Sequence, residues 1–230
     1  MAIKTFVIVP QSILTFPARI SFKSTREVEK DESNPHSVFR NSTKYNIMNK
    51  IKAKLSGKKE IARSLTRLAH EIIEKNDDLS EIAIVGIRTR GDFLAKRLHS
   101  QIEKLSDSEI PIGTLDVTFH RDDFRTNLGS PKVGASHILF EVEGKNVILI
   151  DDVLYTGRTI RAAMDEIFTY GRPASIQLGI LVDRGHKELP IRADYVGKNY
   201  PTSLNEHIHV HVEEVDGEDA VLLMEYEECE

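Results

Sequence analysis

Two patterns of apolar residues divide most of the chain between helices and strands. In residues 60–75 the apolar positions recur every three or four residues, which predicts an amphipathic helix. The unbroken apolar run at 82–87 instead predicts a strand buried on both faces, and 147–150 and 176–182 have the same character. Residues 115–119 alternate between apolar and polar, as strands often do.

Helices are expected between these strands. One begins near Asp92 and runs through Ile102, and another follows the turn at 156–159 and continues to about Tyr170. Strands that alternate with helices predict an α/β fold whose parallel sheet has helices on both faces. Ligands bind such sheets beyond the carboxyl ends of the strands, where the polar segments of this chain fall.

Composition and charge narrow the class of protein. No apolar run is long enough to cross a bilayer, so we expect no membrane span. The single cysteine, Cys229, excludes an intrachain disulfide and suits a reducing compartment, which predicts a cytoplasmic protein. The net charge of -5 is unevenly spread, because residues 212–230 hold nine acids and no Lys or Arg. The remaining body is mildly basic and could take an anionic ligand.

The first 47 residues differ from the rest. Their apolar stretch is broken by Pro10 and lacks a small-residue cleavage site, so a secretory signal is a poor match, and an organellar transit peptide fits the first 26 residues somewhat better. Met48 begins a segment that looks like an ordinary protein start. We therefore expect residues 1–47 to be a non-essential extension and 48–230 to form one domain.

The segment 147–159, VILIDDVLYTGRT, carries the clearest chemistry. An apolar strand leads to two adjacent carboxylates, Asp151 and Asp152, and the turn at 156–159 then opens a helix. The N–H groups and dipole of a helix start favour a phosphate, and Gly157 lets the backbone approach it closely. Carboxylates accept hydrogen bonds from sugar hydroxyls. The pattern thus suits a sugar phosphate with a vicinal diol.

Other nucleotide-binding motifs fit less well. A Walker B strand also ends in an acid, but the chain lacks the upstream glycine-lysine loop that it requires, and it lacks a dinucleotide fingerprint. The segment 147–159 resembles the phosphoribosyl-pyrophosphate motif of type I phosphoribosyltransferases. GIRTRGDFLAKRL (86–98), HRDD (120–123) and VDRGHKELPIRADYVGKNYPTS (182–203) extend the resemblance to the PyrR family. The chain departs from the family in two places. Residues 1–47 precede the point where relatives typically begin, and His120 stands where relatives often carry an aromatic residue.

The resemblance implies a type I phosphoribosyltransferase fold with a mobile lid over the polar loop 120–137. It implies a uracil phosphoribosyltransferase that makes UMP and pyrophosphate from uracil and phosphoribosyl pyrophosphate. The implied catalytic residues are Asp151, Asp152, Arg90 and Arg121. The implied substrate-binding residues are Arg88, Thr89, Arg90 and Gly91 of a pyrophosphate loop, together with Val153, Leu154, Tyr155, Thr156, Gly157, Arg158, Thr159, Asp183 and Val196. Mg²⁺ would arrive on the substrate, and Asp151 and Asp152 would reach it through water.

Two positions address the choice of base. Tyr155 stands where purine-salvage relatives place an acid, and Asp183 stands where they tend to have a lysine. The segment 195–197 resembles the segment of related enzymes whose backbone pairs with the edge of the base. Val196 is therefore one of the implied substrate-binding residues. These differences favour a pyrimidine.

The family resemblance also implies regulation of pyrimidine genes, through binding of pyr messenger RNA in the presence of a uridine nucleotide such as UMP or UTP. Candidate RNA contacts are Thr66, Arg67 and His70 on the polar face of the helix at 60–75, with Arg192 and Lys198. An alternative is a salvage phosphoribosyltransferase for another base without an RNA-binding role, in which that helix face is merely solvated. A homodimer or homotetramer is expected.

The alternating histidines at 207, 209 and 211 would share one face of a strand. Two of them could chelate zinc, but no cysteine or acid is clearly placed to complete a site. We expect a polar outward face there.

Overall fold

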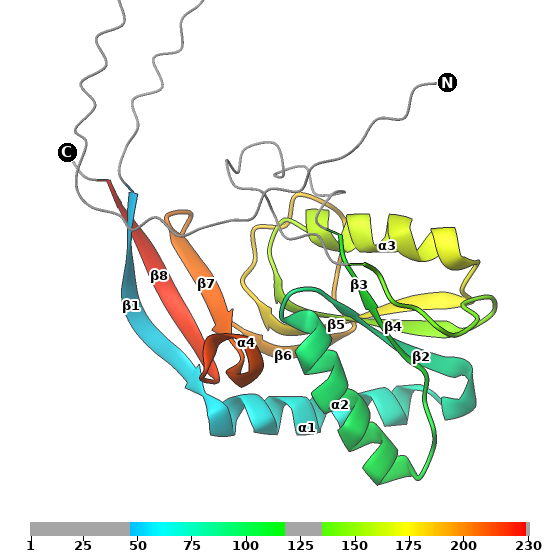
Figure 1. Cartoon of the computed structure of the whole chain (residues 1–230). Helices are drawn as coiled ribbons and strands as arrows, with labels where there is room; N and C mark the ends of the chain where they lie inside the picture. Colours follow the sequence, from blue (N-terminus) through cyan, green and yellow to red (C-terminus); the bar gives the residue numbers. More distant parts are fainter. Residues whose placement is uncertain (1–46, 118–134, 229–230) are drawn as a thin grey trace, which may run out of the picture. The chain divides into compact units, whose positions relative to one another are not determined.

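The computed structural model describes residues 47–117 and 135–228, and its centre is a five-stranded sheet (Figure 1). All neighbouring strands of this sheet are parallel, and their order is β3-β2-β4-β5-β6. The strands are β2 (Ile82–Ile87), β3 (Ile112–Leu115), β4 (Asn146–Leu154), β5 (Ser175–Asp183) and β6 (Tyr195–Asn199). The expected α/β architecture is confirmed.

Helices cover both faces of this sheet (Figure 1). On one face, α1 (Lys58–Lys75) and α2 (Gly91–Ser106) pack with Ile84 and Ile148 in one apolar cluster. On the other, α3 (Arg158–Tyr170) packs with Val85 and Leu149 in a second cluster. Successive residues of a strand point to opposite faces, so a strand between two helical layers must be apolar throughout. All six residues of β2 are buried accordingly.

A second sheet is antiparallel, with the strand order β1-β8-β7. It consists of β1 (Ile47–Gly57), β8 (Ala220–Glu228) and β7 (Glu206–His211), and the short helix α4 (Glu213–Asp216) joins β7 to β8. We call these four elements the hood. Ile208, Val210 and Val221 of the hood belong to the same apolar cluster as α1 and α2, which anchors the hood to that side of the molecule.

The predicted elements agree with the structure except in two strands. β3 covers Ile112–Leu115, where it pairs with β2, so it ends where the predicted strand 115–119 begins; residues 118 and 119 lie outside the described residues. β4 continues beyond residue 150 to Leu154, so the Asp pair lies inside the strand rather than after it. The short 3₁₀ helix Leu79–Glu81 precedes β2. Within the described ranges, no helix has both the length and the apolar character needed to cross a membrane.

Candidate active site

A cavity of about 520 Å³ opens beyond the carboxyl ends of β2 and β4, and β7 of the hood forms another part of its wall. Three predicted segments meet there: the loop after β2, the Asp pair of β4, and the turn before α3. The lining residues are Arg88, Thr89, Arg90, Val117, Asp151, Asp152, Val153, Leu154, Tyr155, Thr156, Gly157, Arg158, Thr159, Ile160, Arg184, His207, Ile208, His209 and Val210.

The two carboxylates differ in their surroundings. Asp151 is buried and its Oδ1 accepts the backbone N–H of Asp152 at 2.9 Å, while the Oδ1 of Asp152 accepts the N–H of Val153 at 2.8 Å. Burial raises the pKa of Asp152, and its hydrogen bond with Asp151 and the nearby charge of Arg90 partly oppose that rise. The ionised form of Asp152 is therefore unfavourable at this position. A ligand that brings hydroxyl groups or positive charge would stabilise it.

The turn before α3 has the form of an anion cradle. Gly157 adopts φ 92°, a left-handed conformation that side chains rarely tolerate, and α3 begins at the next residue. The first N–H groups of a helix lack partners within the helix and point toward the space before it. The hydroxyl of Thr156 already accepts the N–H of Arg158 at 3.3 Å, which holds the turn in shape.

The loop after β2 approaches the Asp pair closely because it ends in glycine. A Cβ on Gly91 would lie 2.6 Å from the carbonyl oxygen of Ile150 and 3.0 Å from the Cα of Asp151, so any larger residue would push the loop away. Gly91 therefore supports the wall from behind rather than lining it. The peptide between Arg88 and Thr89 is cis.

Three polar residues of the cavity were not among the predicted site residues: Arg184, His207 and His209. Arg184 is only 2% exposed, and its guanidinium lies 4.0 Å from the ring centre of Tyr155. It also donates to the carbonyl oxygen of Glu206 at 2.6 Å, which ties the start of β7 to the cavity. The alternating histidines were expected to form a polar outward face, and that expectation was wrong for His207 and His209, because β7 packs next to β4 and brings both to the cavity.

The surroundings of both cavity histidines lower their pKa values. Burial lowers the pKa of His207, and the positive charge of Arg184 lowers it further. Burial likewise lowers the pKa of His209, with Arg90 as the next cause. The described residues contain no cluster of three or more His, Cys, Asp or Glu side chains that could hold a metal, so the zinc alternative finds no support among them.

Two predicted substrate residues lie elsewhere. Asp183 and Val196 line a second, more open hollow instead of the cavity with the Asp pair. The carboxylate of Asp183 accepts the Nζ of Lys187 at 2.7 Å and the N–H of Gly185 at 2.9 Å, so its oxygens are directed into its own turn. Arg121 falls outside the described residues, as does nearly all of the predicted lid.

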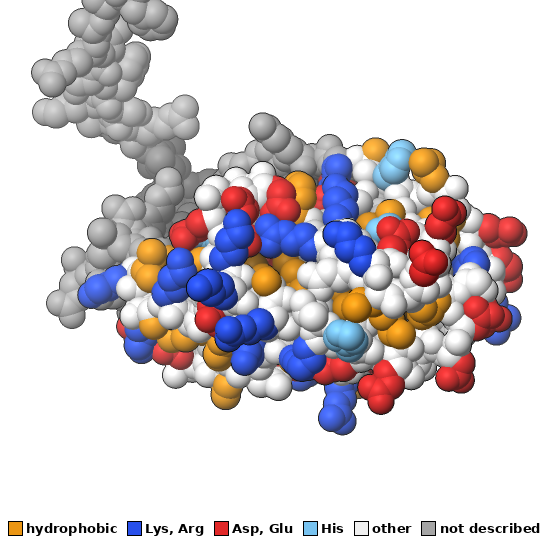
Figure 2. Space-filling view, turned by 90° about the horizontal axis from the view of Figure 1, so that it is seen from below, with side chains coloured by type: hydrophobic (Ala, Val, Ile, Leu, Met, Phe, Trp, Pro, Cys, Tyr) orange, Lys and Arg blue, Asp and Glu red, His pale blue; other side chains and the backbone are white. Residues whose placement is uncertain are grey.

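The second hollow gathers two of the RNA candidates, Arg67 from α1 and Arg192 from the connection before β6. Thr66 and His70 are exposed on α1 beside Arg67, and Lys198 is exposed in β6, which follows Arg192 in the sequence. Figure 2 shows many Lys and Arg side chains over the face on which α1 lies. Arg67 is not simply solvated, because its Nη2 donates to the carbonyl oxygens of Val196 and Gly197 at 2.8 and 2.6 Å.

Solved structures with a similar fold include hypoxanthine phosphoribosyltransferases. The one from Staphylococcus aureus is 19% identical, with a TM-score of 0.56, and the alignment covers 75% of this chain and 92% of that chain. The enzyme from Trypanosoma cruzi is 17% identical, with a TM-score of 0.57, and covers 75% and 90%. At such identities the likeness supports the fold alone.

The sequence comparisons go further. Residues 54–216 match the phosphoribosyl transferase domain family. The bifunctional protein PyrR of Pelotomaculum thermopropionicum is 52% identical over 77% of this chain and 98% of its own length, and that of Clostridioides difficile is 51% identical over 76% and 98%. These matches confirm the predicted fold and favour the predicted enzyme and regulator over a salvage enzyme without an RNA role. The chain belongs to the phosphoribosyl transferase family and, within it, to the bifunctional PyrR proteins.

Proposed function

We propose that this cavity converts uracil and phosphoribosyl pyrophosphate into UMP and pyrophosphate. The observation that carries the proposal is the convergence of the Asp pair, the turn at 156–159 and the loop at 88–91 around one cavity. These are the three groups that the substrate requires: acceptors for a ribose diol, donors for the 5′-phosphate, and cations with N–H groups for the pyrophosphate.

The reaction places positive charge on the sugar as pyrophosphate departs. Stabilisation of the leaving group and exclusion of water are therefore the main tasks of the protein. In this proposal Arg88 and Arg90 meet the departing pyrophosphate, and Asp151 and Asp152 orient the ribose hydroxyls and oppose the developing charge. Arg121 remains a proposed lid residue, on the family resemblance alone.

Mg²⁺ is part of the proposal. Carboxylate oxygens and phosphates are the ligands that Mg²⁺ prefers, and the two acids at the cavity fit a metal that arrives with the substrate and keeps several waters. When bound, the metal would neutralise charge on the pyrophosphate. Asp151 and Asp152 would contact it through water.

We further propose that the base lies against the side of the cavity formed by Tyr155 and β7. Tyr155 is fixed from one side by the buried Arg184, and His207 and His209, whose pKa values are lowered, offer polar ring nitrogens. Since Asp183 and Val196 line the other hollow, their proposed contacts with the base require a rearrangement around β5 and β6 when substrate binds.

The transferase proposal is tested with a panel of radiolabelled bases. The full chain is incubated with phosphoribosyl pyrophosphate, Mg²⁺ and either uracil, cytosine, hypoxanthine or guanine, and the nucleotide products are separated. We expect UMP from uracil and at least about a hundredfold less product from either purine, a ratio within the reach of pocket discrimination. Preferential formation of a purine nucleotide would overturn the choice of base.

The regulatory half of the proposal concerns pyr leader RNA. The candidate RNA surface combines cations with hydroxyl and imidazole groups, which suits the phosphates and unpaired bases of a structured RNA loop. Its residues are Arg67, Arg192, Lys198, Thr66 and His70. Its support is that Arg67 and Arg192, distant in sequence, share one hollow away from the cavity. UMP or UTP in the cavity would be the nucleotide that governs the binding.

Lys198→Gln tests this surface, because Lys198 is exposed at the end of β6 and lines neither hollow. RNA affinity should fall, and the slope of log affinity against log salt should shrink by about 0.7 for one lost single-strand contact. Uracil turnover should stay unchanged. Lys104→Gln, at the far end of α2, is the matched control. Equal RNA affinity in both variants would remove Lys198 from the interface.

The remaining partners are proposals of the same kind. A homodimer or homotetramer is proposed from the family resemblance, and sedimentation of the full chain tests it. A cytoplasmic location is proposed because phosphoribosyl pyrophosphate and nascent transcripts are intracellular molecules.

A further inference from the structure

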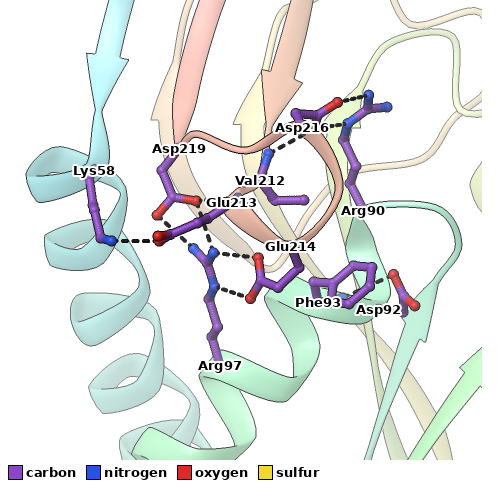
Figure 3. A network of polar contacts seen from close by, with 10 residues as sticks. All are labelled: Lys58, Arg90, Asp92, Phe93, Arg97, Val212, Glu213, Glu214, Asp216 and Asp219. Atoms are coloured by element: carbon purple, nitrogen blue, oxygen red, sulfur yellow. Dashed lines mark hydrogen bonds and ion pairs between the residues drawn. The ribbon is translucent and has the colours of Figure 1, made fainter.

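Arg90 of the pyrophosphate loop is held by a residue of the hood. Its Nε donates to Oδ2 of Asp216 at 2.9 Å and its Nη2 donates to Oδ1 at 2.8 Å (Figure 3). This is a bidentate pair, in which both the angle and the rotation of the guanidinium are fixed. Asp216 lies in α4, far along the chain from the loop that it contacts.

Asp216 is itself fixed in place. Its Oδ2 also accepts the N–H of Val212 at 2.9 Å, and its side chain is only 16% exposed. The same turn is fastened to α2 by Arg97, which donates to Glu214 and to Asp219 (Figure 3). A carboxylate that is anchored in this way can impose its geometry on a flexible arginine rather than follow it.

The position of Arg90 matters because it lines the cavity beside the Asp pair. Its charge already acts on Asp152. Without a competing carboxylate, the guanidinium would be drawn onto Asp152 and would occupy the acid that the ribose needs. With Nε and Nη2 turned toward Asp216, no acceptor within the described ranges takes the Nη1 hydrogens, which leaves them available for a phosphate.

We propose that Asp216 is a positioning residue that holds Arg90 away from Asp152 and presents its Nη1 to the pyrophosphate group of the substrate. The inference rests on the proposed function, because it assigns a role to a residue outside the cavity in that reaction. It also gives the hood a part in catalysis: α4 shapes the pyrophosphate loop while β7 lines the cavity.

The test is the affinity of the full chain for magnesium pyrophosphate, measured by calorimetry, with the KM values for phosphoribosyl pyrophosphate and uracil beside it. Asp216→Asn should weaken pyrophosphate binding and raise the KM for phosphoribosyl pyrophosphate by about tenfold or more, as expected for a lost charge-assisted pair. The KM for uracil should change by less than about twofold. Asp216→Ser, which keeps an acceptor for Val212, serves as a second variant with the same expectation.

Glu214→Gln is the matched control, because Glu214 fastens the same turn through Arg97 without touching Arg90. It should bind pyrophosphate within about twofold of the wild type. In an Arg90→Gln background, Asp216→Asn should add less than about a twofold further loss, since both changes remove one interaction.

Three results would overturn the inference: wild-type pyrophosphate affinity in both Asp216 variants, an equal loss in Glu214→Gln, or a full additional loss in the Arg90→Gln background. Failure of the proposed function looks different. A wild-type chain that binds pyrophosphate but makes no UMP would refute the transferase, while the variants' pyrophosphate affinities would still decide the role of Asp216.

Discussion

At the scale of single residues, Arg90 lies between two acids of opposite character: Asp152 in the cavity and Asp216 behind it. The raised pKa of Asp152 means that its ionised form is disfavoured by the folded protein, whereas the lowered pKa of Asp216 means the opposite. A carboxylate that the protein holds at a cost is a candidate for ligand binding, and one that it stabilises is a candidate for positioning. The two acids near Arg90 thus have separate roles.

Thr156→Val tests the phosphate turn at this scale. The hydroxyl of Thr156 is a phosphate donor in the proposed complex, and a charge-assisted hydrogen bond contributes about 1.5–3 kcal/mol. We expect the KM for phosphoribosyl pyrophosphate to rise about tenfold or more with little change in kcat. Thr169→Val, at the other end of α3, is the control, since its hydroxyl donates to Glu166 within the helix. Equal KM values in the two variants would place the phosphate elsewhere.

At the scale of elements, the buried strands and amphipathic helices could be predicted because their patterns are local. β2 was predicted to the residue, since its apolar run is bounded by polar residues on both sides. β4 was predicted too short because Asp151 and Asp152 interrupt its apolar pattern, although Asp151 still pairs with Ile180 of β5. The Asp pair could be recognised in the sequence as a functional motif. The hydrogen-bonded pairing of β4 with β5 beyond residue 150 could not.

Arg67 illustrates what a helical pattern cannot predict. Taken alone, the polar face of α1 predicts that Arg67 is a solvated cation, whose replacement changes stability by no more than about 0.5 kcal/mol. The structure shows that Arg67 also joins α1 to β6 through two backbone carbonyls. That expectation was therefore wrong about the contacts of this side chain, because they depend on a strand more than a hundred residues away.

The corrected expectation is that Arg67→Gln lowers the free energy of unfolding by about 1–2 kcal/mol, with the two charged hydrogen bonds discounted for the half-exposed side chain. Arg63→Gln, on the same helix and without a hydrogen bond in the described part of the chain, should stay within about 0.5 kcal/mol. Urea unfolding of both variants measures the difference. Identical midpoints would show that the bridge from α1 to β6 adds no stability.

The contact between α4 and the pyrophosphate loop has its own pH dependence. Hydrogen bonds from Arg90 lower the pKa of Asp216 from its ordinary 3.8 to about 2, with smaller contributions from the Val212 N–H and His211. The stabilisation should be fully present above the unfolded value and should be lost as the pH falls through the folded value. The stability difference between wild type and Asp216→Asn should therefore be constant from pH 7 to about 5 and shrink below about 4. A difference that stays constant down to pH 2.5 would contradict the pairing.

At the scale of the whole molecule, the second sheet could not be predicted: within the hood only the strand β7 was indicated, by the alternating histidines. The sequence marks residues 212–230 only by their nine acids, but part of this segment forms α4 and β8, and its acids pair with basic residues from distant segments. The pairs include Lys54 with Glu218, Arg90 with Asp216 and Arg97 with Asp219. β1 and β8 lie at opposite ends of the domain sequence, so no local pattern could indicate that they pair.

The predicted extension is tested by shortening the chain. A chain that begins at Met48 keeps all of β1 except Ile47, so we expect its melting temperature to stay within about 2 °C of the full chain and its uracil turnover to be preserved. A chain that begins at Lys58 removes β1 and leaves β8 without its partner strand, and should melt clearly earlier. A large loss of stability or turnover in the first chain would show that residues 1–47 contribute to the domain.

The central claim is that the cavity around the Asp pair is the transferase site, and Asp152→Asn tests it most directly. The change is nearly isosteric and removes the charge that orients the ribose hydroxyls. Because burial raises the pKa of Asp152, the ionised acid weakens the fold at neutral pH, so the variant should melt no earlier than the wild type.

The measurement is UMP formation from uracil at saturating phosphoribosyl pyrophosphate, with thermal melting of the same samples. Asp165→Asn is the control, since Asp165 is an exposed acid on α3 that pairs with Arg161. Turnover should fall by about a hundredfold or more in Asp152→Asn, the usual size of a lost electrostatic contribution to a transition state, and stay near wild type in Asp165→Asn. Near-wild-type turnover by a folded Asp152→Asn variant would contradict the claim.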